Sequence, residues 1–302
     1  MKDITHLVFS GCAFRSLCLL GVLRYLYIEK KNLNIRNVAG ASMGSLFCLI
    51  FALKIPYEKM EEIVKKTISD EEVSTINKDC LINIFFKNGI ESSKKYLKYI
   101  KEYIKEIYHV DDMTFLELSK KTGINLFVSS TNINKNINVI FNINDTPNVS
   151  IFDAVSSSMS IPFLACPIEI DGEYYVDGGL TDNFPIKIFK NVPIENILGV
   201  AIKIPEDIKI NQYQKNKELS LFEYTSQLCN LLYMNSLHHT LLNNIPDEIL
   251  VIEESPIKEW LNFEINKDNI KKGLEQNDID LLIIKGFYDI SNYMKKYEDI
   301  KT

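Results

Sequence analysis

The serine best placed for chemistry lies in the segment Gly40-Ala41-Ser42-Met43-Gly44. Where a G-x-S-x-G segment joins a strand to a helix, a sharp turn exposes the serine hydroxyl for nucleophilic attack. The start of the following helix lends positive potential to the anion that develops. The alternative is a chance match, but only 12 of the 302 residues are glycine. The segment therefore favours Ser42 as a nucleophile.

A second candidate is the loop Ser-Gly-Cys-Ala-Phe-Arg over residues 10–15, which follows the first predicted strand. Loops after neighbouring parallel strands meet at one edge of a sheet, so the amides of Gly11, Cys12 and Ala13 could point at Ser42. Amides placed in this way stabilise an oxyanion. An ordinary loop is the alternative. Arg15, one of only three arginines in the chain, favours a functional loop.

The third candidate is Asp177-Gly178-Gly179, which ends a predicted strand. A carboxylate at this point can accept a proton, and two glycines allow another backbone to approach closely. Asp-Gly is also a common turn dipeptide, so a plain turn is the alternative.

The histidines decide between two ways of activating Ser42. A hydrolase with the chain order serine, acid, histidine needs a base after Asp177, where only His238 and His239 remain. Both fall inside a predicted helix, so we favour a carboxylate that accepts the serine proton directly, with Asp177 best placed. An esterase with His238 or His239 as its base stays open as an alternative.

The predicted elements position these residues on an α/β sheet. Strands at 5–9 and 35–39 alternate with helices at 16–29 and 45–53, and such a unit implies parallel strands joined by helical crossovers. Residues 56–120 are expected to be mainly helical, including a helix over 91–108. Further predictions are strands at 125–129, 139–142, 196–202 and 249–252, a hairpin over 167–176 turning at Asp171-Gly172, and helices at 151–157, 217–242 and from 278.

Three motifs in this order resemble the patatin-like phospholipase family, in the versions found in large DNA viruses and bacteria. They are the elbow at 40–44, the segment Ser157-Ser158-Met159-Ser160-Ile161-Pro162-Phe163, and Asp177-Gly178-Gly179-Leu180-Thr181-Asp182-Asn183-Phe184-Pro185. The resemblance covers about residues 5–205. It implies a three-layer fold with a mostly parallel sheet flanked by helices, and residues 206–302 then form a mainly helical C-terminal extension packed on that domain.

The resemblance also implies the chemistry. In this family a Ser–Asp dyad without histidine hydrolyses fatty acyl esters of lipids, which implies Ser42 as nucleophile and Asp177 as proton acceptor. It implies residues 11–16 as the oxyanion loop, with Arg15 at its basic position. The family loop reads Gly-Gly-Gly-x-Arg/Lys-Gly, whereas here only Gly11 and Arg15 match, and Cys12, Ala13 and Ser16 replace the other three glycines. An inactive or slow lipid-binding protein is therefore a further alternative.

Composition limits the partners. With a net charge of −6 and a pI near 5.4, the chain lacks the basic field of a general nucleic-acid binder. Six scattered cysteines and no signal peptide suggest a cytoplasmic protein, in the host cytoplasm if viral. The expected partner is a phospholipid or other acyl lipid. No cofactor or metal is expected.

Two further predictions concern lipid contact. Met43, Phe47, Phe163 and Leu164 could line an acyl channel, although they could equally be plain core. On the predicted helix over 91–108, four lysines share one face (Lys94, Lys98, Lys101 and Lys105). Such a face can dock peripherally on anionic lipid, but a solvated face over a packed helix is the favoured interpretation.

Overall fold

The computed structural model describes residues 4–29, 33–203, 221–244, 249–252, 263–265, 269–272 and 276–299. Within these residues the central sheet has the strand order β11-β10-β1-β2-β5-β9-β8, and β6 pairs with β5. Its parallel part consists of β11 (Ile249–Ile252), β10 (Ile197–Ile202), β1 (His6–Phe9), β2 (Asn37–Ala41) and β5 (Asn125–Asn132).

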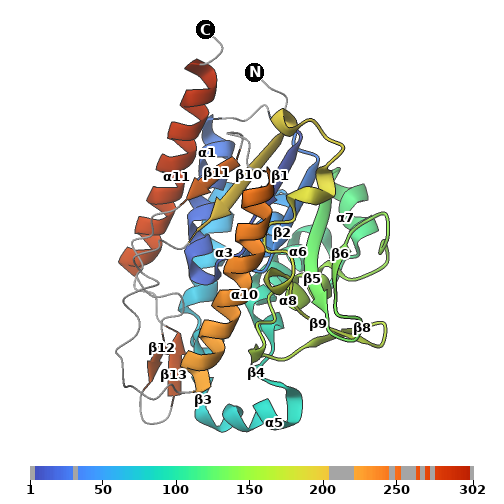
Figure 1. The fold of residues 1–302 in the computed structure, drawn as a ribbon, viewed down its shortest axis with the longest axis vertical. Coiled ribbons are helices and arrows are strands. Elements are labelled where there is room, and N and C mark those ends of the chain that lie inside the picture. The colour runs from blue at the N-terminus through green and yellow to red at the C-terminus, as the bar shows by residue number, and fades with distance from the viewer. Residues whose placement is uncertain are drawn as a thin grey trace.

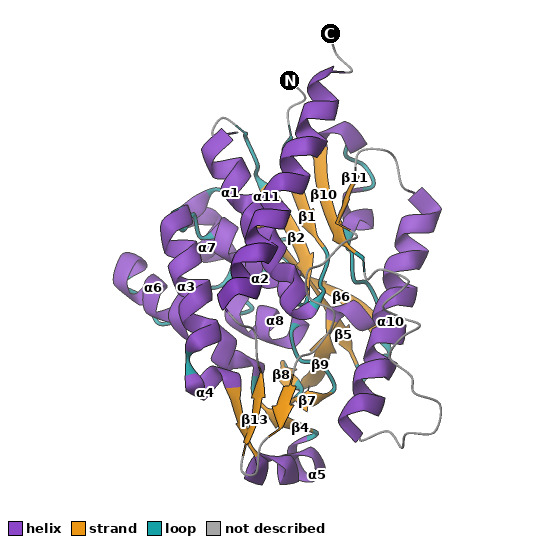
Figure 2. Ribbon diagram, turned by 90° about the vertical axis from the view of Figure 1, so that its left-hand side faces the viewer, coloured by secondary structure: helices purple, strands orange, loops and turns teal. Residues whose placement is uncertain are grey.

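The parallel strands are buried on both faces, which explains their continuous apolar sequences. Every residue of β10 is buried, as are Leu7, Val8 and Phe9 of β1. Figure 2 shows helices on both sides of this sheet. On one side lie α1 (Cys18–Glu29), α2 (Met43–Ala52), α3 (Tyr57–Ser69) and α11 (Gln276–Asp299), and on the other lies α10 (Leu221–Asn244). The chain therefore has the expected three layers around a mostly parallel sheet.

The remaining strands form the antiparallel edge and two small sheets (Figure 1). At the edge, β6 (Ile137–Phe141) and β9 (Glu173–Asp177) both pair with β5, and β8 (Ile168–Ile170) pairs with β9. One small sheet joins β3 (Thr75–Asn77), β13 (Asn269–Lys272) and β12 (Phe263–Ile265), and the other joins β4 (Gly89–Glu91) to β7 (Phe163–Ala165). The connecting helices are α4 (Glu71–Ser74), α5 (Asn83–Lys87), α6 (Lys98–Tyr108), α7 (Phe115–Thr122) and α8 (Ile151–Ser158).

Most of the predicted helices and strands are confirmed, although their first and last residues differ from the predicted ones. The hairpin turns at Asp171-Gly172 as expected, and both residues have positive φ, 52° and 78°. The predicted strand at 249–252 is β11. Residues 204–220, where the expected C-terminal extension begins, lie outside the described residues.

The helix expected over 91–108 is wrong in its first part. Glu91 ends strand β4, a 3₁₀ turn spans Ser93–Leu97, and the α-helix α6 begins only at Lys98. The cause is β4, which pairs with β7 although it is only three residues long. Tertiary pairing here overrides the helical pattern of the sequence.

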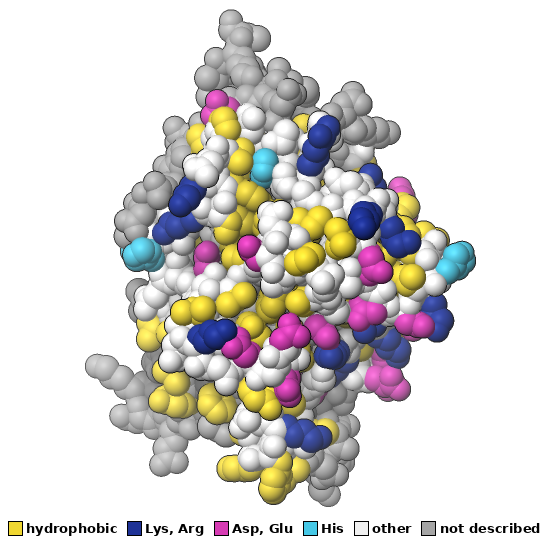
Figure 3. Space-filling view, turned by 90° about the vertical axis from the view of Figure 1, so that its right-hand side faces the viewer, with side chains coloured by type: hydrophobic (Ala, Val, Ile, Leu, Met, Phe, Trp, Pro, Cys, Tyr) yellow, Lys and Arg dark blue, Asp and Glu magenta, His cyan; other side chains and the backbone are white. Residues whose placement is uncertain are grey.

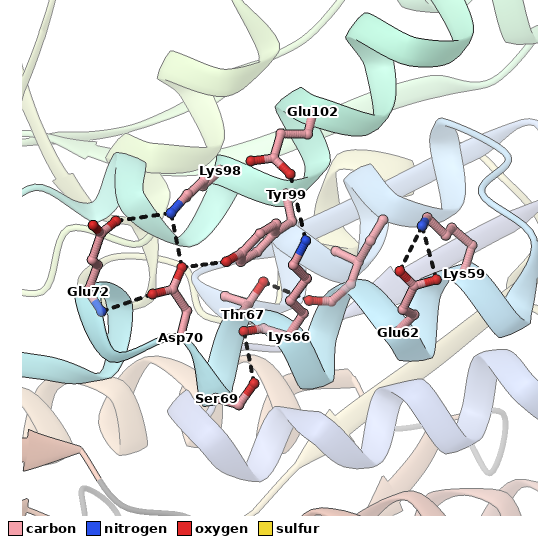
Figure 4. Close-up of polar contacts among 11 residues, drawn as sticks. Lys59, Glu62, Lys66, Thr67, Ser69, Asp70, Glu72, Lys98, Tyr99 and Glu102 are labelled. Carbon is pink, nitrogen blue, oxygen red and sulfur yellow. Dashed lines mark hydrogen bonds and ion pairs between the residues drawn. The ribbon is translucent and has the colours of Figure 1, made fainter.

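Three of the four lysines predicted to share one face are paired with acidic side chains. Lys98 Nζ lies between Asp70 (3.1 Å) and Glu72 (3.0 Å), and the Tyr99 hydroxyl also donates to Asp70 (Figure 4). The other lysines contact Asp153 (Lys94, 2.7 Å), Asp111 (Lys105, 2.7 Å) and the ring of Phe152 (Lys101). Because Ile100 and Ile104 are buried beneath them, α6 fits the interpretation of a solvated face over a packed helix.

Candidate active site

The register of strand β5 brings two distant segments together. Strand β2 pairs parallel with β5, and its last residue, Ala41, lies opposite Ser129. Strand β9 pairs antiparallel with the following residues of β5, and its last residue, Asp177, lies opposite Ser130. Strand β6 occupies the other side of β5 over the same stretch, so β2 and β9 share one side. The two strands therefore meet end to end. The residue after β2, Ser42, faces the last residue of β9, Asp177.

The turn at Ser42 has the strained geometry that exposes a nucleophile. Ser42 has φ 49° and ψ −132°, a conformation that few non-glycine residues adopt. Close packing holds it there. A Cβ on Gly44 would lie 2.6 Å from the carbonyl oxygen of Ser10, and a Cβ on Gly178 would lie 2.0 Å from that of Ser129. The glycines of both motifs are thus required by the approach of neighbouring backbone.

Ser42 and Asp177 form a direct hydrogen bond. The Ser42 hydroxyl donates to Asp177 Oδ2 at 2.7 Å, and the amide of Gly179 donates to Oδ1 at 2.8 Å. Asp177 is fully buried, and Ser42 is 6% exposed. The two side chains are therefore in the direct contact that the predicted pairing of Ser42 with Asp177 requires.

Burial sets the charge state of Asp177. Desolvation raises the pKa of its carboxyl group to about 7, although hydrogen bonds from Ser42, Gly179 and Tyr233 favour the carboxylate and lower it. A carboxyl group that titrates near neutral pH is suited to take up a proton and return it in turn.

The predicted oxyanion loop divides into two parts. The amide of Gly11 donates to Asn183 Oδ1 (3.2 Å), and that of Cys12 donates to Ser16 Oγ (2.8 Å), so both are used within the protein. Ala13 begins a 3₁₀ helix, where the first amides have no intrahelical acceptor. It also lines the cavity beside Ser42 and has φ 44°. Ala13 is thus the loop residue best placed to donate to an oxyanion.

Arg15 lies against the loop itself. Its side chain is only 1% exposed and hydrogen-bonds the thiol of Cys12, which opposes the rise in the pKa of that thiol caused by burial. Arg15 is not among the residues that line the cavities at Ser42. The structure therefore places it as a buried support of the turn.

An apolar cavity leads away from Ser42. It has a volume of about 1110 Å³, counting the space at its open mouth. Met43, Phe47 and Leu164 line it as predicted, whereas Phe163 is 48% exposed and is not part of its wall. The backbone of Phe163 has φ 65°, in the left-handed region. Most of the remaining wall is aliphatic, including Leu46, Ile50, Ile63, Val64, Ile100 and Met159.

None of the four histidines, all of which are described, lies between Ser42 and Asp177. His238 and His239 are exposed on α10, whose inward residues Tyr233, Met234 and Leu237 line a smaller cavity at Ser42. A histidine base would need to stand between the serine and the acid, where a direct hydrogen bond already exists. The geometry therefore does not support the esterase alternative.

Three site residues carry no role in the sequence predictions. Ser158 Oγ accepts from the Ser42 amide (2.8 Å) and donates to the carbonyl of Ser129 (2.6 Å), which ties the elbow to β5. Asn183 also donates back to the carbonyl of Gly11 (3.0 Å) and fixes the loop. Tyr233 packs on Gly179 beside Asp177. The first two lie in the quoted motifs, but Tyr233 comes from a distant helix without a sequence signal.

Comparisons with known proteins agree with this fold. A family model described as patatin-like phospholipase matches residues 7–190. An uncharacterised protein, R571, of Acanthamoeba polyphaga mimivirus is 28% identical over 206 residues, 66% of each chain. A protein named "Probable lipid hydrolase 463L", from invertebrate iridescent virus 6, is 35% identical over 192 residues, 62% of this chain and 63% of that one. The matches thus span just under two thirds of these relatives' lengths.

Among solved structures, VipD of Legionella pneumophila is similar in fold, with a TM-score of 0.60 at 15% identity. The alignment covers 97% of this chain and 67% of VipD. Together, the sheet and this similarity define a protein of the three-layer α/β class, built on a mostly parallel sheet. Because the family model matches more than half of the residues, the chain belongs to the patatin-like phospholipase family.

Two kinds of feature are absent from the described residues. Across those segments, no helix has both the length and the apolar composition to cross a membrane. The same segments hold no group of three or more His, Cys, Asp or Glu side chains arranged to hold a metal ion.

Proposed function

We propose that this protein is a lipid acyl hydrolase of the phospholipase A type, with Ser42 as nucleophile and Asp177 as its proton acceptor. The observation that carries the proposal is the 2.7 Å hydrogen bond from the strained Ser42 to the buried Asp177, beside an apolar cavity. Family membership and the name of the iridescent-virus relative support a lipid ester as substrate.

The reaction proceeds through two acyl transfers. In the first, Asp177 takes the proton of Ser42 as Oγ attacks the ester carbonyl, and it then passes that proton to the departing alcohol. This leaves the fatty acyl group esterified to Ser42. In the second, Asp177 takes a proton from water, the hydroxide attacks the acyl carbonyl, and the proton returns to Ser42 as the fatty acid leaves.

The oxyanion of both steps is stabilised by amides at two helix starts. Ala13 begins the 3₁₀ helix of the loop, and Met43 begins α2 directly after the nucleophile. Both residues line the cavity at Ser42. The apolar wall beyond them suits an acyl chain, since burying each methylene is worth about 0.8 kcal/mol.

The experiment that tests this function is release of free fatty acid from mixed phospholipid vesicles without added calcium. Wild type is compared with Ser42→Ala and Asp177→Asn, and we expect both substitutions to lower the rate by about 10²-fold or more. Matched controls are Ser69→Ala and Asp171→Asn, which remove the same groups from exposed positions and should retain full activity. Circular dichroism checks that every variant folds.

The result that contradicts the proposal is equally definite. Folded wild type that releases no more fatty acid than Ser42→Ala is not a hydrolase of these lipids. Retained activity in Asp177→Asn would remove Asp177 from the mechanism.

A second candidate function is lipid binding with little turnover. The observation behind it is Ala13, which holds a positive φ of 44° although it carries a Cβ. A left-handed alanine costs about 1 kcal/mol, and its methyl group narrows the space where the family has glycine. The same assay separates the two functions, because a binding protein associates with vesicles and releases nothing.

A further inference from the structure

The 3₁₀ turn Lys78–Ile82 and the short helix α5 that follows it, together called the tip here, have one packed face and one bare face. On the packed side, Cys80, Leu81 and Ile84 pack against the buried Ile90 in a small apolar cluster that also includes Leu164. This cluster is separate from the main core, so the tip is anchored locally to strands β4 and β7.

The bare face carries large apolar side chains. Phe85 and Phe86 are 79% and 78% exposed, and Ile82 is 55% exposed. A buried phenylalanine removes roughly 150–250 Å² from water, so two adjacent exposed rings forgo a large stabilisation. Contiguous exposed apolar groups of this kind mark an interaction surface.

The tip adjoins the active-site cavity. Leu164 packs in the same small cluster around Ile90 as the tip residues, and it also lines the cavity that reaches Ser42. Glu91 and Ala165, on the two strands that carry the tip, line that cavity as well. The apolar cluster at the base of the tip therefore shares Leu164 with the cavity wall.

The shape of the tip favours a lipid surface over a protein groove. Both ribbon views place α5 at the extreme end of the molecule (Figures 1 and 2). Figure 3 shows hydrophobic side chains at this same end, close to a basic side chain. A projecting apolar wedge can enter a bilayer without a shaped partner, and the exposed Lys87 at the end of α5 suits the headgroup layer.

We propose that the tip docks the protein on a phospholipid bilayer by inserting Ile82, Phe85 and Phe86 among the lipids. This inference rests on the proposed function, since it lets an acyl chain pass from the bilayer to the cavity beside it. Insertion, not charge, drives the contact, because the neighbouring Lys94 and Lys98 are already paired with acidic side chains.

The experiment measures flotation of the full chain with phosphatidylcholine vesicles. All proteins carry Ser42→Ala, so binding is read without hydrolysis. We expect Phe85→Ser/Phe86→Ser to bind about tenfold or more weakly, since two apolar anchors are lost. The matched control is Ile284→Ser/Tyr288→Ser, which removes exposed apolar side chains from α11 (61% and 62% exposed) and should bind normally. Raising the salt concentration should leave binding unchanged, because insertion is not screened.

Three results would overturn the docking proposal. These are full vesicle binding by the Phe85→Ser/Phe86→Ser protein, an equal loss in the α11 control, or a loss of self-association with vesicle binding unchanged. The last result, read by sedimentation velocity, would assign the tip to a second copy of the chain.

Hydrolysis by proteins that keep Ser42 tests the docking proposal independently of flotation. We expect Phe85→Ser/Phe86→Ser to lose hydrolysis of vesicle phospholipid but to keep hydrolysis of a soluble short-chain ester. Vesicle binding without fatty acid release in wild type would contradict the hydrolase function and leave docking intact. Vesicle hydrolysis that does not depend on the two phenylalanines would contradict docking and leave the hydrolase function intact.

Discussion

At the scale of single residues, burial determines what Asp177 can do. An exposed aspartate is too weak a base to take a serine proton near neutral pH, since its pKa is about 4. Burial raises the pKa of Asp177 to about 7, while the amide of Gly179 keeps one carboxylate oxygen oriented. The other oxygen accepts the hydrogen bond from Ser42. In the proposed mechanism this single carboxyl group takes the place of the acid and base of a triad.

The first prediction follows from this pKa. The carboxylate is the active form, so activity should fall about tenfold per pH unit below about 7 and level off above it. The measurement is the pH profile of kcat/KM on a soluble short-chain ester. The double variant His238→Ala/His239→Ala should keep the same midpoint, because these exposed histidines do not contact the dyad.

A different profile would contradict this role of Asp177. Activity that stays level down to about pH 5 would mean that the carboxyl group has an ordinary pKa. A midpoint that moves when the two histidines are replaced would restore a histidine base.

At the scale of elements, two helices far apart in the sequence pack at glycines. A Cβ on Gly21 of α1 would lie 1.9 Å from the carbonyl oxygen of Ile283, and one on Gly286 of α11 would lie 1.8 Å from that of Cys18. Backbone thus meets backbone where α11 crosses α1. The C-terminal helix is fixed onto the first βα unit of the sheet by this contact.

The second prediction is that Gly286→Ala destabilises the protein by about 1–3 kcal/mol through overpacking. The direction of this change in stability is informative, because replacing glycine by alanine within a helix otherwise stabilises a protein by roughly 0.5–1 kcal/mol. Chemical denaturation measures the free energy of unfolding. Lys295→Ala, at an exposed position of the same helix, is the control and should change little. A stabilised Gly286→Ala protein would contradict the close crossing.

At the scale of the whole molecule, the layers of the fold could be predicted because their signals are local. The alternation of strands and helices over residues 5–53 specifies a parallel sheet with crossovers, and apolar strands specify burial on both faces. The short strands β3, β4 and β7 could not be predicted in this way. Each has three residues and is stabilised by pairing with a partner distant in sequence.

The site was predictable to the extent that its chemistry lies in motifs. Ser42 and Asp177 stand at strand ends, where the topology of the sheet brings them together. The contact of Tyr233 with Asp177 depends on how α10 crosses the sheet, which no local pattern encodes. The amides of Gly11 and Cys12 donate to the side chains of Asn183 and Ser16. These hydrogen bonds could not be predicted either, because only the folded structure positions those side chains.

The measurement that tests the central claim most directly is labelling by a fluorophosphonate, followed by peptide mapping. An activated serine attacks the phosphorus and expels fluoride, so the adduct identifies the nucleophile. We predict a single adduct on Ser42, formed about 10²-fold or more slowly in Asp177→Asn and at the normal rate in the exposed control Asp171→Asn. An adduct on another residue, or equal labelling of Ser42 in Asp177→Asn, would contradict activation of Ser42 by Asp177.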